Sequence, residues 1–299
     1  MKTDLHTLLA TSGPILADGG MGTMLMAHGL TVGNAPELWN VEHPNRIQAV
    51  HRGYVEAGAQ IILTNSFGGN RLRLALHDLA ERAAELNQAA GRIARRVADA
   101  ASHPVVVAGS MGPTGGLLKP LGELDYETMV EVYQQQAAAL AEGGVDVFWV
   151  ETMSSLEEVR AALQGARQAA PDRPSVATMT FESRGHTMMG VSPEKALDAL
   201  AGEALAAFGA NCGNGPGEVE AALEKMRAVA PDTTLVAKSN AGLPHMEGMI
   251  PVYDAGPPEM AAHAVKAHQL GARIIGACCG STPEHIQAMA RALAQAIEA

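Results

Sequence analysis

The sequence predicts an α/β protein in which residues 1–299 form one domain, a single (β/α)8 TIM barrel. Short apolar or β-branched runs recur eight times along the chain, and amphipathic segments of helical length separate most of them. Apolar strands that alternate with helices indicate a parallel sheet covered on both faces, and eight such units fit a closed barrel. An open doubly wound sheet is the alternative, but it usually has fewer strands and a glycine-rich first turn.

The expected elements follow one another without a linker or a low-complexity segment. Strands are expected at residues 14–18, 59–65, 105–110, 145–151, 175–180, 206–212, 234–240 and 273–278. Helices are expected at residues 45–57, 79–101, 126–143, 156–169, 193–204, 217–230, 257–270 and 283–298. Because chemistry in such barrels is located at the carboxyl ends of the strands, the residues that end each apolar run are the candidates for a site.

Composition and charge exclude several classes of protein. With 47% hydrophobic and 18% charged residues, the chain can bury a sizeable core, yet no apolar run is long enough to span a bilayer. A net charge of −11 argues against a nucleic-acid partner, and pairs such as Arg71 with Arg73 are expected on solvated helix faces. The N-terminus does not resemble a secretory signal, which predicts a cytoplasmic protein. A homo-oligomer is compatible with the sequence.

The three cysteines, Cys212, Cys278 and Cys279, each follow an apolar run and precede a glycine. Adjacent cysteines rarely bridge each other, but both can turn toward one ion at a loop. Three thiolates that converge on Zn²⁺ and leave the fourth position open are typical of a catalytic site, which makes zinc the favoured interpretation. The alternatives are three buried thiols, a disulfide that leaves one thiol over, and a redox sensor without metal.

Polar residues end the other expected strands as well. They are Asp18, Asn65, Ser110, Glu151, Thr178 or Thr180, Asn211 and Asn240. A carboxylate at the end of a buried strand needs a partner, which could be a helix cap or a loop amide. Beside the thiolates, an ammonium-bearing substrate is the favoured partner for Asp18 and Glu151. The glycines after Asp18 let backbone N–H groups approach an anion, so the pair of features suits an α-amino acid.

These motifs resemble the zinc-dependent homocysteine S-methyltransferases over about residues 18–293. The resemblance is carried by Asp-Gly-Gly-Met-Gly-Thr at 18–23, Thr-Asn-Ser-Phe-Gly-Gly at 64–69, Gly-Pro-Thr-Gly at 112–115, Glu-Thr-Met at 151–153, Gly-Ala-Asn-Cys at 209–212 and Gly-Ala-Cys-Cys-Gly-Ser-Thr-Pro-Glu-His at 276–285. The pairing of Asn-Cys with Cys-Cys-Gly is the specific part. The resemblance implies a homocysteine-binding barrel.

The resemblance also implies roles for single residues. Cys212, Cys278 and Cys279 would be the zinc ligands, and Asn240 would occupy the fourth zinc position before the substrate arrives. Glu151 and Asp18 would hold the amino group of homocysteine near Asn211, and backbone N–H groups of Gly19, Gly20 and Met21 would face its carboxylate. Zinc would lower the pKa of the substrate thiol, so no catalytic residue beyond the zinc site is expected.

The methyl donor is expected to be a small onium compound. Within this family the closest resemblance is to bacterial betaine–homocysteine methyltransferases, through residues 36–40, 64–69 and 187–190. A quaternary ammonium needs aromatic faces, for which Trp39, Phe67 and Phe181 are the candidates, although the animal betaine enzymes have a tyrosine where Gly68 stands. Donors such as S-methylmethionine or dimethylsulfonium compounds are the alternative. A further alternative is a homocysteine-activating module that receives methyl groups from methyl-tetrahydrofolate or methylcobalamin on a partner protein.

Overall fold

The predicted barrel is confirmed by the computed structural model, which describes residues 3–248 and 250–298. Eight strands form one sheet in which every pairing is parallel. They are β1 (Ile15–Leu16), β2 (Ile61–Leu63), β3 (Val106–Met111), β4 (Val147–Met153), β5 (Ser175–Met179), β6 (Ala207–Cys212), β7 (Leu235–Ser239) and β10 (Ala272–Ala277). A parallel bridge from Ala17 to Ile61 joins the first strand to the second and closes the barrel.

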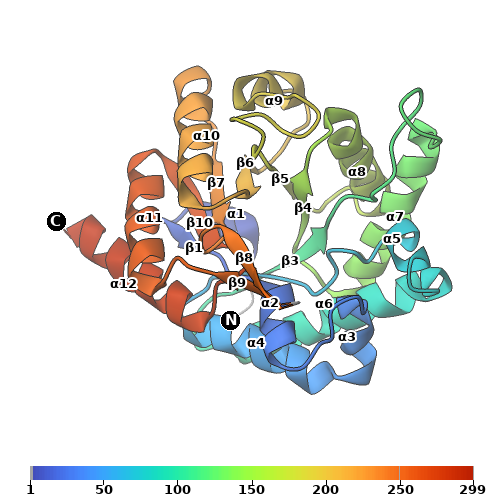
Figure 1. The fold of residues 1–299 in the computed structure, drawn as a ribbon, viewed down its shortest axis with the longest axis horizontal. Helices are drawn as coiled ribbons and strands as arrows, with labels where there is room; N and C mark the ends of the chain where they lie inside the picture. The colour runs from blue at the N-terminus through green and yellow to red at the C-terminus, as the bar shows by residue number, and fades with distance from the viewer. Residues whose placement is uncertain (1–2, 249, 299) are drawn as a thin grey trace.

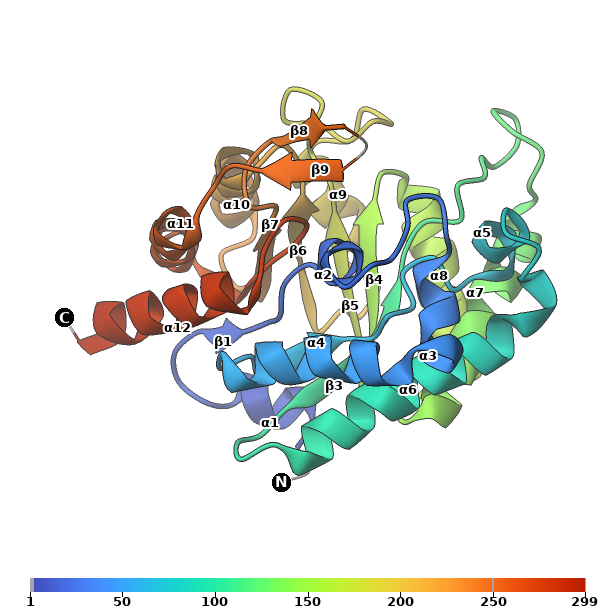
Figure 2. The ribbon, with the colours of Figure 1, turned by 60° about the horizontal axis from the view of Figure 1, so that its bottom comes forward.

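Helices surround the sheet as the alternation of patterns predicts (Figures 1 and 2). They are α4 (Pro44–Glu56), α6 (Ala83–Ala100), α7 (Tyr126–Gly143), α8 (Leu156–Ala169), α9 (Pro193–Leu200), α10 (Pro216–Val229), α11 (Pro257–Gln269) and α12 (Pro283–Glu298). The main difference is α9, which ends four residues before the expected position at Ala204. Gly202, a poor helix former, lies in the turn that follows it.

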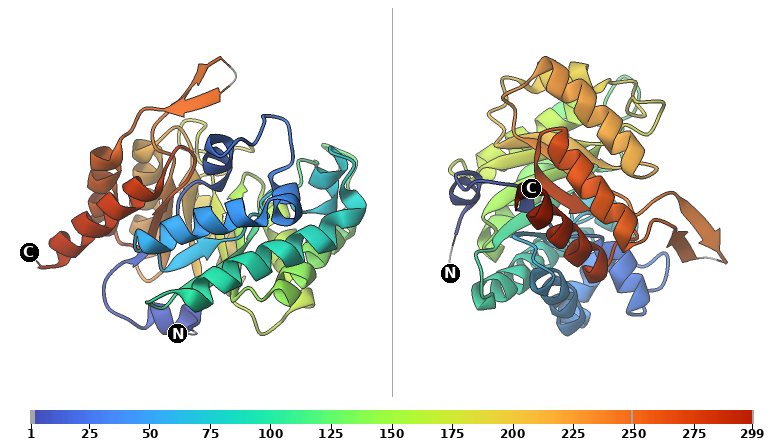
Figure 3. Two further views of the ribbon diagram at one scale, coloured as in Figure 1. Left: turned by 90° about the horizontal axis from the view of Figure 1, so that it is seen from below. Right: turned by 90° about the vertical axis from the view of Figure 1, so that its left-hand side faces the viewer.

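Several short elements lack a signal in the sequence because they contain too few residues to show a period. They are α1 (Leu5–Leu9), α2 (Met21–Ala27), the 3₁₀ turn η1 (Pro36–Leu38), α3 (Trp39–Glu42), α5 (Arg71–Ala75), the 3₁₀ turn η2 (Ala80–Arg82), and the antiparallel hairpin of β8 (Pro244–Glu247) and β9 (Ile250–Tyr253). The hairpin connects β7 to α11 and projects away from the barrel in Figure 3.

The barrel interior is a packed apolar core. Side chains two positions apart on a strand face the same side, and one such set meets Leu5 and Leu8 of α1 inside the barrel. The set is Ile15, Ala17, Ile61, Leu63, Val106, Ala108, Val147, Trp149, Val176, Ala207, Val236 and Ile274. The guanidinium of Arg273, in the second position of β10, donates to carbonyl oxygens at the end of α1. Therefore α1 covers the amino ends of the strands, and the opposite end carries the polar residues.

Among the described helices, none combines the length and the apolar composition that crossing a bilayer requires.

Candidate metal and substrate site

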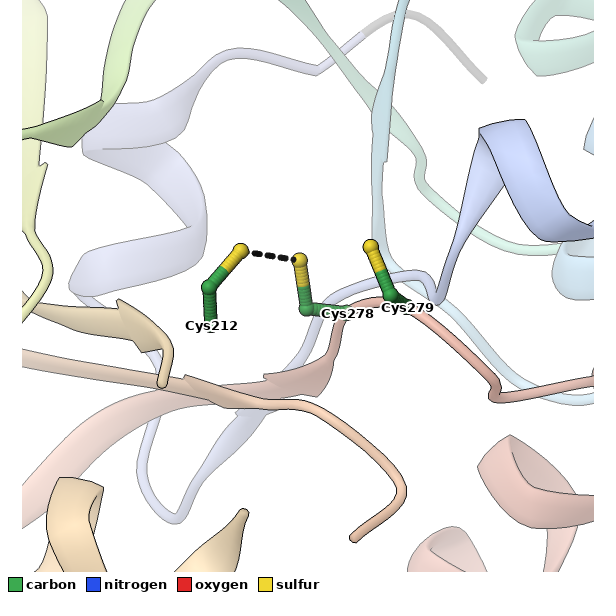
Figure 4. A group of neighbouring side chains, drawn as sticks. All are labelled: Cys212, Cys278 and Cys279. Atoms are coloured by element: carbon green, nitrogen blue, oxygen red, sulfur yellow. Dashed lines mark hydrogen bonds between the residues drawn. The ribbon is translucent and has the colours of Figure 1, made fainter. Parts of the chain in front are cut away.

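The three cysteine side chains converge at the carboxyl ends of two strands. Cys212 is the last residue of β6, and Cys278 and Cys279 directly follow β10. Both strands pair with β7, so the two cysteine loops flank the same strand. All three Sγ atoms lie within 4.8 Å of one another, and the Sγ atoms of Cys212 and Cys278 are 2.9 Å apart (Figure 4).

This donor set fits a thiophilic metal ion. Hydrogen bonds from the thiols of Cys212 and Cys278 lower the pKa of Cys279 well below its usual value. A cluster that already favours one thiolate, with three sulfurs close enough to share an ion, has the chemistry of a Zn²⁺ site with three protein ligands. Tyr253, the last residue of β9, packs its ring against Gly280, directly after Cys279. The residues present therefore fit the metal that the sequence predicts.

Asn211 holds the backbone that presents Cys212. Both Thr152 (φ 61°) and Cys212 (φ 57°) adopt the left-handed conformation, which is strained for residues other than glycine. The Asn211 amide connects them, because its Oδ1 accepts from Thr152 N at 2.9 Å and its Nδ2 donates to Thr152 Oγ1 at 2.7 Å. The same Nδ2 lies 3.4 Å from Cys212 Sγ. Asn211 thus contacts a cysteine rather than lining the substrate cavity.

Asn240 connects the two cysteine loops. Its Nδ2 donates to Gly213 O at 2.6 Å, and its Oδ1 accepts from Cys279 N at 3.0 Å. Both polar atoms of the side chain are therefore engaged with the backbone of the two cysteine loops. The expectation that Asn240 is an exchangeable fourth zinc ligand stays a prediction.

Glu151 lies buried beside the cysteines with little compensation for its charge. The pairing of β4 with β5 shifts register between Val150 and Met153, and such bulges re-aim side chains near active sites. Ser110 Oγ donates to Glu151 Oε1 in a short hydrogen bond. Burial raises the pKa of Glu151 to about 7, and the nearby Cys278 adds to this effect. Among the described residues Glu151 forms no ion pair, although the charge of Lys238 acts to lower its pKa.

Asp18 has a partner that the sequence analysis missed. Lys238 Nζ donates to Asp18 Oδ1 at 2.6 Å and to Asp18 O at 3.1 Å, and Leu63 N donates to Asp18 Oδ2 at 2.7 Å. Both side chains of the ion pair are 2% exposed. Burial alone lowers the pKa of Lys238, but the charges of Asp18 and Glu151 outweigh it and keep the ammonium protonated. A lysine inside the apolar run at 234–240 is the signal that could have revealed this pair.

One cavity of ≈ 450 Å³ joins these groups, a volume typical of small-molecule sites. Of the residues expected to bind metal or ligands, its wall contains Asp18, Gly19, Gly20, Met21, Phe67, Glu151, Cys212, Cys278 and Cys279. Lys238, Glu37, Arg73 and His77 line it too, although the sequence analysis did not single them out. A larger hollow of ≈ 780 Å³ between α9 and α10 contains none of these groups.

The turn at Gly19 and Gly20 is fixed by its neighbours. A side chain at Gly19 would collide with Ser281 Oγ and the ring of Tyr54. The amide of Gly20 donates to Ser281 Oγ at 2.9 Å, and Tyr54 donates its hydroxyl to Gly20 O. The Gly20 N–H is therefore engaged within the protein, and α2 begins at Met21, directly after it.

Trp39 is not in the wall of the cavity. Its side chain is 7% exposed, the Arg46 guanidinium lies 4.8 Å from the ring centroid, and the ring of His43 packs against it edge-on. Because a cation of the protein already occupies one face of the ring, the expectation that Trp39 cages a donor is corrected. Phe67, by contrast, lines the cavity and is 40% exposed. Phe181 is buried in the core.

Comparisons with known proteins agree with this geometry. A family model described as homocysteine S-methyltransferase matches residues 15–293. Among solved structures, the metallated form of the homocysteine methyltransferase MmuM from Escherichia coli is similar, with 27% identity and a TM-score of 0.80 over 96% of this chain and 99% of that chain. The oxidized form of the same protein has 26% identity and a TM-score of 0.81 over 96% and 98% of the two chains.

Similar curated proteins include the methionine synthases of Mycobacterium tuberculosis and Mycobacterium leprae. Each is 35% identical over 98% of this chain, and the match covers 25% of each synthase. The chain thus spans about a quarter of the length of these relatives.

The Asp18–Lys238 ion pair generates a prediction about stability. Lys238→Met leaves Asp18 buried without a counter-charge, so the free energy of unfolding should fall by about 3–5 kcal/mol. Denaturant unfolding of the metal-free protein measures this loss. The double variant Asp18→Asn/Lys238→Met should recover most of it, and Lys266→Met on the exposed face of α11 is the control. An unchanged midpoint in Lys238→Met would contradict the role given to the pair.

Proposed function

The chain belongs to the homocysteine S-methyltransferase family, and from this premise we propose that it is a zinc-dependent enzyme that transfers a methyl group from a small onium donor, betaine first, to homocysteine and forms methionine. The observation that carries the proposal is the convergence of three thiols on a cavity that also contains the buried carboxyl group of Glu151.

The proposed metal ligands are Cys212, Cys278 and Cys279. Zn²⁺ bound there would lower the pKa of the homocysteine thiol and hold the sulfur as a nucleophile at neutral pH. Asn211 and Asn240 form hydrogen bonds that fix the backbone of the loops that carry these cysteines.

The proposed amino-group site is Glu151, with Asp18 beside it. A substrate ammonium supplies the positive charge that the buried Glu151 lacks, and it favours the ionised carboxylate. Asp18 lines the same cavity, but its charge is already balanced by Lys238, so we assign it the smaller part. The start of α2 at Met21, after the turn of Gly19 and Gly20, faces the substrate carboxylate in this proposal.

The proposed donor binds on the solvent side of homocysteine, against Phe67. The ring is held in place because Gly112 has no side chain where the ring packs, and Gly112 N donates to Phe67 O at 2.9 Å. A cation over this ring gains from its negative face and from the negative thiolates beyond it. The substrate sulfur then forms a bond to the methyl carbon, while the onium atom leaves with the electron pair of the broken bond.

A second candidate function is favoured by the comparison with methionine synthases. Because this chain matches only a quarter of those proteins, it could act as their homocysteine-activating part and receive methyl groups from methylcobalamin or methyl-tetrahydrofolate on a partner protein. S-Methylmethionine and dimethylsulfonium compounds are the other donors to include with betaine.

A donor panel tests the proposal directly. The purified zinc-loaded protein is incubated with homocysteine and each donor, and methionine is measured by mass spectrometry. We expect methionine from betaine or another onium compound without any added protein. Methionine formation from methylcobalamin or methyl-tetrahydrofolate alone would instead support the second candidate function.

Removal of one ligand tests the metal site. Any of Cys212→Ala, Cys278→Ala and Cys279→Ala should reduce bound zinc from one equivalent to near zero and abolish methyl transfer. The circular-dichroism spectrum should persist, because the barrel core does not include the ion. Metal analysis and the spectrum are independent of turnover. Stoichiometric zinc in all three variants would refute the site.

Neutralisation of Glu151 tests the amino-group site. Glu151→Gln should raise the KM for homocysteine at least about tenfold, since a hydrogen bond to a charged group contributes about 1.5–3 kcal/mol, while the zinc content stays unchanged. Glu157→Gln, on the exposed side of α8, is the matched control. Unaltered homocysteine kinetics in Glu151→Gln would assign Glu151 a structural role.

A further inference from the structure

The outer part of the cavity contains the cation Arg73 and the imidazole of His77, which no role above explains. Arg73 belongs to α5, and His77 lies in the turn after it, so the two are four residues apart on one side of this segment. Asn70 fixes the start of the helix, because its Oδ1 accepts from Arg73 N at 3.0 Å. The sequence predicts a solvated face for Arg71 and Arg73. In the structure Arg73 is exposed, as is His77, and both also line the cavity.

The Arg73 guanidinium has charge to offer to a ligand, and the His77 imidazole has a hydrogen-bond donor. Among the described residues, neither Arg73 nor His77 forms an ion pair with a carboxylate. The Arg73 guanidinium lies beside Gly115, with Nη1 3.2 Å from the place where a Cβ on that glycine would be. The nearby Glu37 is buried, and its Oε1 accepts from Gly68 N at 2.7 Å. Arg73 therefore keeps its hydrogen-bond donors for the cavity.

The cavity has opposite charges at its two ends. The inner end holds the three thiols and Glu151, and the Asp18–Lys238 pair adds no net charge there. The outer end holds Arg73 and His77, with the exposed ring of Phe67 on the wall of the same cavity. Glu37 lines the cavity near them, and burial raises the pKa of its carboxyl group, which disfavours its negative charge. A field of this kind orients a dipolar ligand, with its cation inward and its anion outward. That orientation points an onium methyl group at the sulfur cluster.

We propose that Arg73, assisted by His77, binds the carboxylate of the methyl donor, which is a carboxylate-bearing onium compound held with its onium group against Phe67. The proposal rests on the proposed function, since it specifies the donor for the same reaction. A guanidinium can grip a carboxylate through two parallel hydrogen bonds, so it selects against onium compounds that carry an alcohol or no second group. Arg73 is thus the residue that determines donor class.

Two unreactive probes separate the halves of this site. The first probe is 3,3-dimethylbutanoate, which has the shape and carboxylate of betaine but no cation and no transferable methyl group. The second is choline, which has the cation but no carboxylate. Binding of each to the zinc-loaded protein with homocysteine is measured by titration calorimetry. Because neither measurement needs turnover, the result does not depend on which compound donates methyl groups.

Arg73→Gln should weaken binding of 3,3-dimethylbutanoate at least about tenfold and leave the dissociation constant of choline unchanged. Arg73→Lys should restore part of the affinity, because it keeps the charge but not the paired hydrogen bonds. Arg71→Gln removes the same charge from the same helix outside the cavity wall and should change neither constant. Phe67→Ala should produce the opposite pattern and weaken choline alone.

The outcomes distinguish this inference from the proposed function. If wild-type protein binds choline but not 3,3-dimethylbutanoate, or if Arg73→Gln changes both probes equally or neither, the carboxylate site is wrong even where betaine yields methionine. If the carboxylate probe responds to Arg73→Gln while no onium compound yields methionine, the proposed donor is wrong and the carboxylate-binding site stands.

Discussion

The parallel pairing of β6 and β10 with the same central strand, β7, is the constraint on which the site depends. Parallel strands bring their carboxyl ends to one edge, so cysteines 66 residues apart in the chain meet without any disulfide. Strand pairing alone does not turn the three sulfur atoms toward one another. Their direction also depends on the left-handed backbone at Cys212, on Asn211, which bonds to Thr152, and on Asn240, which connects the two cysteine loops.

A buried ion pair connects the same part of the barrel to its first strand. Lys238 reaches from β7 to Asp18 after β1, although β10 lies between these two strands. A charge buried this deeply is tolerated only because its partner is equally buried and hydrogen-bonded. Lys238 and Asp18 also act on Glu151 in the same cavity, since the charge of Lys238 lowers the pKa of Glu151 and the charge of Asp18 raises it. The charge state of Glu151 therefore depends on the same buried pair.

Patterns that recur along the whole sequence predicted most of the fold. The features that they missed depend on local geometry. Eight apolar runs identified the strands, and the positions of Cys212, Cys278 and Cys279 after such runs predicted their convergence. Outside helices and strands, no repeating pattern in the sequence predicts which way a side chain points. Trp39 therefore faces Arg46 instead of the cavity, and Arg73 of the five-residue helix α5 lines the cavity instead of facing solvent alone. Lys238 was recognisable in principle, as a charge inside a buried strand, but its partner was not.

The helix α1, which covers the amino ends of the strands, has a consequence for the order of events in catalysis. With Leu5 and Leu8 packed into the apolar interior, the described part of the chain gives the cavity its access at the carboxyl end alone. In the proposed function, homocysteine at the cysteines and a donor at Phe67 would share this one opening. The inner molecule would then bind first and leave last, so the closed amino end of the barrel would favour an ordered kinetic scheme.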